Sequence, residues 1–307
     1  MISNMILLFA GFVMLIKGSD IFVDASSEIA KKFKIPPIII GMTIVAMGTS
    51  APELSVSITS SLKGMNDMSI ANVVGSNIFN ILVALGVSSM FGKLKINNYK
   101  DIWMLLGSCL GLLLMVVNRT LGVFNGIVLL IAFTMYILSM IKQVKDNKEQ
   151  QQEEDDGKQR NLLLTILLGI LGLVAIVWGG DLVVNSASAI ALKLGLSENL
   201  IGLTIVALGT SLPEFVTSVM AIKKGESEIA IGNIIGSNIF NILLILGVAS
   251  TIKPLVVSTV AICDILFMVF TVVMFVCLTK KEKVLTKNKG ILTIMTYVVY
   301  LVFTIIR

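Results

Sequence analysis

Long apolar runs separated by short polar segments make up most of the chain. The runs lie near residues 4–29, 36–62, 69–91, 101–118 and 121–141, and then near 161–190, 198–222, 229–251, 255–279 and 290–306. About 20 consecutive apolar residues are enough for a helix to cross a bilayer. The pattern therefore predicts an all-α polytopic membrane protein with ten transmembrane helices, five on each side of a polar gap.

The gap between the two sets of runs covers residues 142–160 and is rich in Gln, Glu, Asp and Lys. Such a segment is too polar to pack and too short to form a domain. We interpret it as a linker, with a weak acidic Ca²⁺ sensor at 153–156 as the alternative. The predicted organisation is a first five-helix repeat at 1–141, the linker, and a second repeat at 161–307.

Two motifs recur in the two halves at one constant offset of 161 residues. Residues 41–53 (GMTIVAMGTSAPE) return as 202–214 (GLTIVALGTSLPE), and residues 72–80 (NVVGSNIFN) return as 233–241 (NIIGSNIFN). The same offset aligns Asp20 with Asp181. This register indicates a gene duplication. Because each copy has an odd number of spans, the second copy is expected to be inverted in the membrane, and inverted repeats place a substrate site near the bilayer midplane.

The basic residues predict the orientation, since Lys and Arg accumulate in cytoplasmic loops. Eighteen of them fall on the side of the linker and five on the opposite side, with Lys17 left inside the first span. The bias predicts a multi-pass plasma-membrane protein with a cytoplasmic linker and both termini outside.

Composition narrows the chemistry. The chain has no histidine, and its three cysteines, Cys109, Cys263 and Cys277, lie inside apolar runs, where a thiol behaves as a small hydrophobe. The ligands that remain are carboxylate, amide, hydroxyl and carbonyl oxygens, which suit hard cations. No phosphate-binding GxxxxGK[ST] loop is present. We therefore expect neither an enzyme nor an ATP-driven pump. We also expect the protein to contact membrane lipid, and to need no cofactor, nucleic acid or obligatory protein partner.

Glu53 and Glu214 lie near the middles of the second and seventh runs, each directly after a proline. A carboxylate at that depth costs roughly 2 to 3 kcal/mol or more, so the pair needs a partner or an ion. The alternative is that both are protonated and only hold the bundle together through hydrogen bonds to hydroxyl groups.

The segments around these glutamates predict discontinuous second and seventh helices. The residues expected to break them are Gly48, Pro52, Gly209 and Pro213. Hydroxyl groups follow at Thr49, Ser50, Thr210 and Ser211, and we expect freed carbonyls at Ala46 and Ala207 to face a polar cavity. A proline kink without any ligand role is the alternative.

The repeated GSNIFN segments supply further oxygen groups. Ser76 and Asn80 are four residues apart and share a helix face, and the same holds for Ser237 and Asn241. Asn77 and Asn238 point about 100° away. Hydrogen bonding between helices is the alternative role for all these residues, and we assign it to Asn77 and Asn238.

Further acidic residues also lie in apolar runs. We interpret Asp20, Asp24 and Asp181 as charges near a membrane interface or as partners of Lys17, and Asp264 is left without a role.

The repeated motifs resemble the α-repeats of the Ca²⁺:cation antiporter superfamily, particularly prokaryotic sodium/calcium exchangers. The resemblance covers essentially the whole chain. It implies a ten-helix fold in which the first and sixth helices slide across a core. It also implies that Glu53 and Glu214 are the central Ca²⁺ and Na⁺ ligands, completed by Thr49, Ser50, Ser76, Asn80, Thr210, Ser211, Ser237, Asn241 and the carbonyls of Ala46 and Ala207.

Asn241 departs from the pattern of the family, since many members have Asp at this position. The missing carboxylate argues against K⁺ co-transport and puts the usual Na⁺ stoichiometry in question. The resulting expectation is a Na⁺/Ca²⁺ antiporter that binds Ca²⁺ and Na⁺. A Ca²⁺/H⁺ antiporter is the first alternative, and a cation channel or uniporter is the second.

Overall fold

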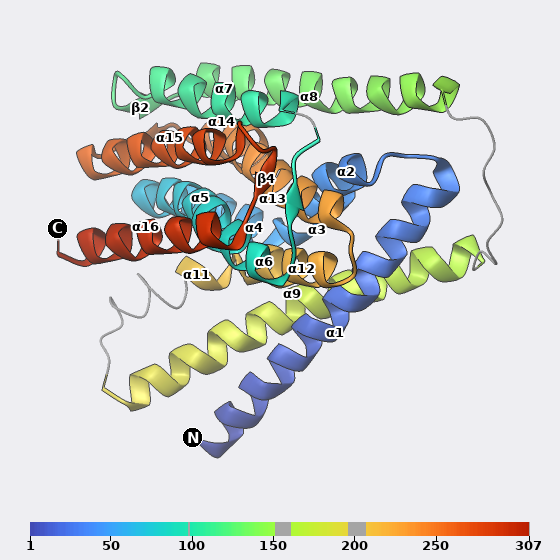
Figure 1. The fold of residues 1–307 in the computed structure, drawn as a ribbon. Coiled ribbons are helices and arrows are strands. Elements are labelled where there is room, and N and C mark those ends of the chain that lie inside the picture. The colour runs from blue at the N-terminus through green and yellow to red at the C-terminus, as the bar shows by residue number, and fades with distance from the viewer. Residues whose placement is uncertain (98, 151–160, 196–206, 307) are drawn as a thin grey trace.

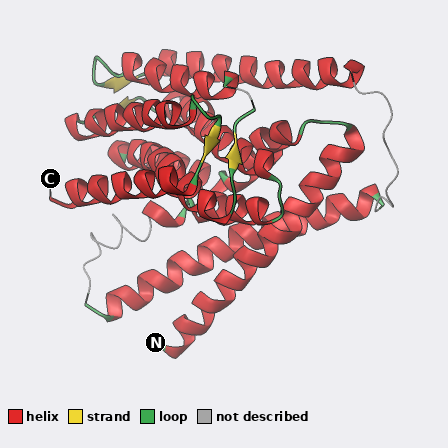
Figure 2. Cartoon of the chain, viewed as in Figure 1, coloured by secondary structure: helices red, strands yellow, loops and turns green. Residues whose placement is uncertain are grey.

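A computed structural model describes residues 1–97, 99–150, 161–195 and 207–306, and shows an α-helical bundle crossed by two long helices (Figures 1 and 2). Seven described helical segments are long and apolar enough to span a membrane, and an eighth span results if one bent pair is counted. The seven are 2–33, 67–91, 123–145, 162–193, 227–252, 259–279 and 287–306. The fold is thus that of a multi-pass membrane protein.

The helices of the first half are α1 (Ile2–Phe33), α2 (Pro37–Ile40), the π-helix η1 (Gly41–Val45), α3 (Ala46–Thr49), α4 (Ala51–Leu62), α5 (Asn66–Phe79), the π-helix η2 (Asn80–Ala84), α6 (Leu85–Phe91), α7 (Lys100–Met115) and α8 (Val123–Gln150). Those of the second half are α9 (Leu162–Lys193), α11 (Ala207–Gly209), α12 (Leu212–Lys223), α13 (Ser227–Phe240), the π-helix η4 (Asn241–Ile245), α14 (Leu246–Ile252), α15 (Thr259–Thr279) and α16 (Lys287–Ile306).

The sequence repeat is visible in these bounds, because α4, α5, η2 and α6 return as α12, α13, η4 and α14 at the same offset of 161 residues. Two short antiparallel sheets each join one strand from either half. In one, β1 (Leu94–Lys95) pairs with β4 (Val284–Leu285), and in the other β2 (Thr120–Leu121) pairs with β3 (Leu255–Val256). The two halves are therefore interlocked and do not form separate bodies.

Two of the ten predicted spans lie outside the seven long segments and the bent pair. The run near 101–118 forms α7, which is 16 residues long. The run near 198–222 contains α11 and α12, and its first part falls in 196–206, outside the described residues. The count of ten spans therefore stays a prediction. The predicted linker begins as helix, since α8 continues to Gln150.

α1 and α9 pack against each other over much of their length and run obliquely across the bundle (Figure 1). Glycines permit this close approach. A Cβ added at Gly18 would lie 2.8 Å from the carbonyl oxygen of Gly172, and a Cβ added at Gly179 would lie 2.8 Å from that of Gly11. Small residues at such crossings let helix backbones approach within a membrane. The two helices therefore form one packed pair.

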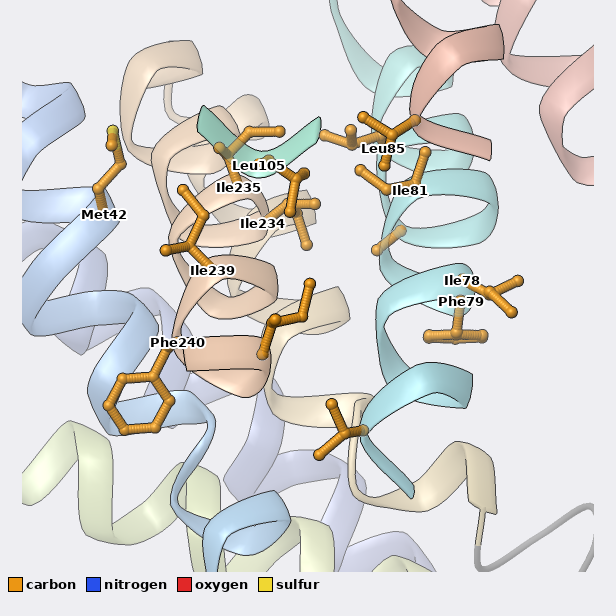
Figure 3. Close-up of a cluster of buried hydrophobic side chains, with 14 of the residues drawn as sticks. Met42, Ile78, Phe79, Ile81, Leu85, Leu105, Ile234, Ile235, Ile239 and Phe240 are labelled. Carbon is orange, nitrogen blue, oxygen red and sulfur yellow. The ribbon is translucent and has the colours of Figure 1, made fainter. Parts of the chain in front are cut away.

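The core lies around α5 and α13. Every residue of α13 from Ile229 to Phe240 is buried. Figure 3 shows part of this apolar cluster, with Ile78 and Phe79 on α5 and Ile234 and Ile239 on α13. By contrast, α8 and α16 expose large apolar side chains such as Phe124, Ile131, Val299 and Phe303. An apolar outer surface of this kind suits lipid and is unfavourable in water.

Candidate cation site

The two predicted helix breaks lie at Ser50 and Ser211. Ser50 has φ −84° and ψ 10°, and Ser211 has φ −88° and ψ 2°. At Ser50 the chain bends by 49° between the helices before and after it. Pro52 and Pro213 follow within the first turn of the next helix, where a missing N–H costs little. The prolines thus begin a second half-helix, which explains why they are tolerated at this depth.

Glu53 and Glu214 lie in the first turns of α4 and α12 and are completely buried. The backbone N–H groups of a helix start carry partial positive charge, which stabilises a carboxylate placed there. Broken membrane helices use the same ends to hold charged groups. The breaks therefore lower the cost of two buried negative charges.

Each glutamate is held by a hydroxyl group from the opposite repeat. Ser50 Oγ donates to Glu214 Oε1 at 2.7 Å, and Ser211 Oγ donates to Glu53 Oε1 at 3.2 Å. Ser76 Oγ also donates to Glu53 Oε1, at 3.4 Å. The exchange of hydrogen bonds brings the two half-helices together at the centre of the molecule.

Four buried oxygen atoms in this region have no hydrogen-bond partner among the described residues. They are Glu53 Oε2, Glu214 Oε2, Asn80 Oδ1 and Asn241 Oδ1. Buried acceptors are nearly always satisfied in folded proteins, so four at equivalent positions of two repeats need an explanation. Carboxylate and amide oxygens are ligands of hard cations. The set is therefore suited to bind a cation that has given up its water.

Asn77 and Asn238 determine which way these amides face. Asn80 Nδ2 donates to Asn238 Oδ1 at 2.9 Å, and Asn241 Nδ2 donates to Asn77 Oδ1 at 3.0 Å. Because their nitrogens are used in this way, Asn80 and Asn241 keep their oxygens available. Asn77 and Asn238 also donate to each other's backbone carbonyls at 3.2 Å, which confirms their predicted role between helices.

Thr49 and Thr210 contact asparagines that the sequence analysis did not single out. Thr49 Oγ1 donates to Asn233 Oδ1 at 3.1 Å, and Asn233 Nδ2 donates to the backbone carbonyl of Glu214 at 3.2 Å. The equivalent chain in the other direction runs from Thr210 through Asn72 to the carbonyl of Glu53. Asn72 and Asn233 thus brace the backbone under each glutamate. Their position at the start of the repeated NVVGSNIFN and NIIGSNIFN blocks was the available signal.

The carbonyl of Ala46 is not freed as expected. It accepts the backbone N–H of Ser50 at 3.0 Å and the hydroxyl of Ser237 at 3.4 Å. The helical hydrogen bond from Ser50 N–H to the Ala46 carbonyl is still formed, because the helix ends at Ser50 itself and not before it. Ala207 borders the segment 196–206, so the expectation for its carbonyl stays a prediction.

Gly48 and Gly209 allow a neighbouring helix to pack closely against the chain at these positions, in addition to any weakening of their own helices. A Cβ at Gly48 would lie 2.8 Å from Leu173 Cδ1, and one at Gly209 would lie 2.1 Å from Val184 Cγ2. Both neighbours belong to α9. The glycines therefore allow α9 to lie directly against the two helix breaks.

The remaining acidic residues lie apart from this centre. Asp20 and Asp24 pair with Lys224, so of their two expected roles the pairing with Lys17 was wrong, and the position near a membrane interface stays a prediction. Asp264 accepts a hydrogen bond from the hydroxyl of Tyr300 at 3.0 Å. In the described part of the chain no group of three or more Cys, Asp or Glu side chains could hold a metal, so two carboxylates with amides and hydroxyls form the best candidate.

Comparisons with known protein families, with individual proteins and with solved structures all find sodium/calcium exchangers. The model of the family described as "Sodium/calcium exchanger protein" matches residues 3–142 and 164–306. A sodium/calcium exchanger of Methanosarcina acetivorans is 32% identical, with 97% of each chain covered. A protein described as a putative antiporter of Alkalimonas amylolytica is 34% identical over 85% of this chain and 84% of its own.

Among solved structures, the sodium-calcium exchanger NCX_Mj, in crystals soaked with Na⁺ and Ca²⁺, is similar over 97% of both chains. The TM-score is 0.86 and the sequence identity 30%. The likeness extends over the whole fold and is not limited to the two motifs.

Proposed function

Since the chain belongs to the sodium/calcium exchanger protein family, we propose that it exchanges Ca²⁺ for Na⁺ across a membrane by alternating access. The observation that carries this proposal is the pair of buried glutamates, one from each repeat, each with one carboxylate oxygen that has no hydrogen-bond partner among the described residues, as is also the case for the amide oxygens of Asn80 and Asn241. By the same proposal, the hydroxyls of Ser50, Ser76, Ser211 and Ser237 complete the site, with Thr49 and Thr210 beside it. Ca²⁺ and Na⁺ are the cargo.

Charge explains why exchange would be obligatory. Two carboxylates neutralise one Ca²⁺, or attract Na⁺ ions into overlapping positions, but cannot bind both kinds of ion fully at once. An empty site leaves two bare charges in a medium of low dielectric constant, which is costly. Only the protein with Ca²⁺ or Na⁺ bound then changes conformation readily. Ca²⁺ must therefore leave before Na⁺ is carried back, and the reverse.

Asn241 limits the charge of the site. An amide oxygen still binds a cation, but it adds no third negative charge. In the proposal, the site therefore binds one Ca²⁺ or Na⁺ without K⁺. Asp20, Asp24 and Asp264 do not replace the missing carboxylate, because Asp20 and Asp24 pair with Lys224 and Asp264 accepts a hydrogen bond from Tyr300.

The packed pair of α1 and α9 would provide the movement. α9 lies against both helix breaks, and the glycine contacts between α9 and α1, which cross each other in Figure 1, allow the pair to shift as a unit. In the proposed ten-helix inverted arrangement, a shift of this pair opens the site to one side and then to the other. The proposed location is the plasma membrane, with both termini outside and the linker in the cytoplasm.

The proposal predicts ⁴⁵Ca²⁺ uptake into proteoliposomes loaded with Na⁺ and diluted into Na⁺-free medium at equal pH. Uptake should stop when the Na⁺ gradient is removed, and adding K⁺ should not change it. Protons can also neutralise buried carboxylates, so a Ca²⁺/H⁺ antiporter is the second candidate. Uptake that follows a pH gradient and ignores Na⁺ would establish it instead, and currents that persist without any counter-ion would indicate a channel.

A further inference from the structure

A polar contact fastens α1 to the turn between α12 and α13. Lys224 Nζ lies 2.8 Å from Asp20 Oδ1 and 2.6 Å from Asp24 Oδ1. Nearby, Ser27 Oγ donates to Glu226 Oε1 at 2.5 Å. We call these contacts the α1 latch. It joins a helix of the first repeat to a turn of the second, so it links the α1–α9 pair to the core.

The duplication places equivalent groups at the turn after α4. The offset of 161 residues relates Lys224 to Lys63 and Asp20 to Asp181. Each lysine follows the last residue of a half-helix, and the glycine after it has positive φ, 75° after Lys63 and 81° after Lys224. The two turns therefore have the same local backbone, and each has its lysine at the same position of the turn.

Only one of the two equivalent contacts is formed in this structure. α1 packs along α12, whereas α9 makes no comparable contact with α4. Lys63 and Asp181 are both exposed, and no ion pair joins them in the described part of the chain. The structure thus shows a closed contact at one end of the molecule and its separated equivalent at the other.

We propose that Lys63 and Asp181 form an equivalent ion pair, the α9 latch, when the protein faces the opposite side of the membrane. This inference rests on the proposed alternating-access function. Exchange of the conformations of the two repeats would bring α9 against α4 as α1 now lies against α12. One latch would then close the site at each end, and the two would never be open together.

The two latches differ in strength. The residue equivalent to Asp24 is Asn185, and the residue equivalent to Glu226 is Met65. The α9 latch therefore has one carboxylate instead of two, and no acceptor for the serine contact. This difference stabilises the present conformation over the opposite one when no ion gradient is applied.

Cross-linking tests the proposal, using a short bifunctional maleimide between Lys63→Cys and Asp181→Cys. Cys263 and Cys277 are replaced by Ser first because they are exposed, while Cys109 is buried and stays. Adding Lys224→Gln should raise the cross-linking rate about fivefold, the shift expected from losing a partly exposed ion pair. The control is Lys223→Gln, which removes the same charge from the neighbouring residue at the end of α12. Lys223 lies over the Phe91 ring and takes no part in the α1 latch.

A pair that never cross-links, or one that reacts equally fast in the Lys224→Gln and Lys223→Gln proteins, would overturn the proposal. If Lys224→Gln reduces the amount of folded protein, Asp24→Asn weakens the α1 latch from the other side and should act in the same direction. Cross-linking reports the conformation whichever ion is carried. An absence of Na⁺-driven Ca²⁺ uptake would therefore count against the proposed function, while the cross-linking rates would still test whether the α9 latch forms.

Discussion

Na⁺-driven Ca²⁺ uptake is expected to fall at least about a hundredfold when Gln replaces Glu53 or Glu214. Gln keeps the shape of the side chain and one oxygen, but it removes one of the two negative charges that face the ion. Removing one partner of a buried charge pair costs about 3 kcal/mol or more, which corresponds to a hundredfold or greater loss of affinity. Because Ser50 and Ser211 can still donate to the remaining amide oxygens, the proteins should fold.

Initial rates of ⁴⁵Ca²⁺ uptake, normalised to the amount of folded protein in the vesicles, measure this effect. Glu282→Gln is the matched control, because Glu282 is exposed and pairs with Lys289 away from the site. The control should transport at the rate of the unmodified protein. Transport retained by either site variant would remove that glutamate from the proposed site.

The second large effect is expected at Gly236, where Ala should destabilise the protein by about 1 to 3 kcal/mol. A Cβ at this position would lie 2.5 Å from Met42 Cα and 2.6 Å from the Met42 carbonyl oxygen. Both are backbone atoms of η1, so no side-chain rotation relieves the clash, and overpacking of this kind costs 1 to 3 kcal/mol. The shift would also displace Ser237 from the Ala46 carbonyl.

Thermal unfolding of the purified protein in detergent measures this loss. The control is Gly107→Ala on α7, where no described residue lies within 4 Å of the added Cβ. Since Ala is the better helix former by up to about 1 kcal/mol, this control should be neutral or slightly stabilised. Equal unfolding temperatures for the two variants would show that α13 and η1 are not packed as the structure has them.

Much of the site could be predicted because duplication kept costly residues in both halves. A proline and a carboxylate in an apolar run are each unfavourable, so Pro52–Glu53 and its repeat at Pro213–Glu214 stand out without any coordinates. The helix break followed from the same residues and was located to within a few positions, at Ser50 and Ser211. The family motifs pointed to the same groups.

What the sequence could not give was the choice of partners between the repeats. Periodicity places Ser50 beside Glu53, but the hydrogen bond goes to Glu214 of the other repeat. The bonded carbonyl of Ala46 and the Lys224 partner of Asp20 were missed for the same reason. Such contacts depend on how the two repeats pack together, and the local pattern carries no information on this.

Locating a bound divalent cation tests the account most directly. Crystals soaked with Sr²⁺ as a substitute for Ca²⁺ and measured near its absorption edge should show one strong anomalous peak between Glu53 and Glu214, next to the oxygens of Asn80 and Asn241. The peak should weaken when Na⁺ is raised at constant Sr²⁺. Two glutamates separated by apolar side chains, with the only peaks at the protein surface, would contradict the account.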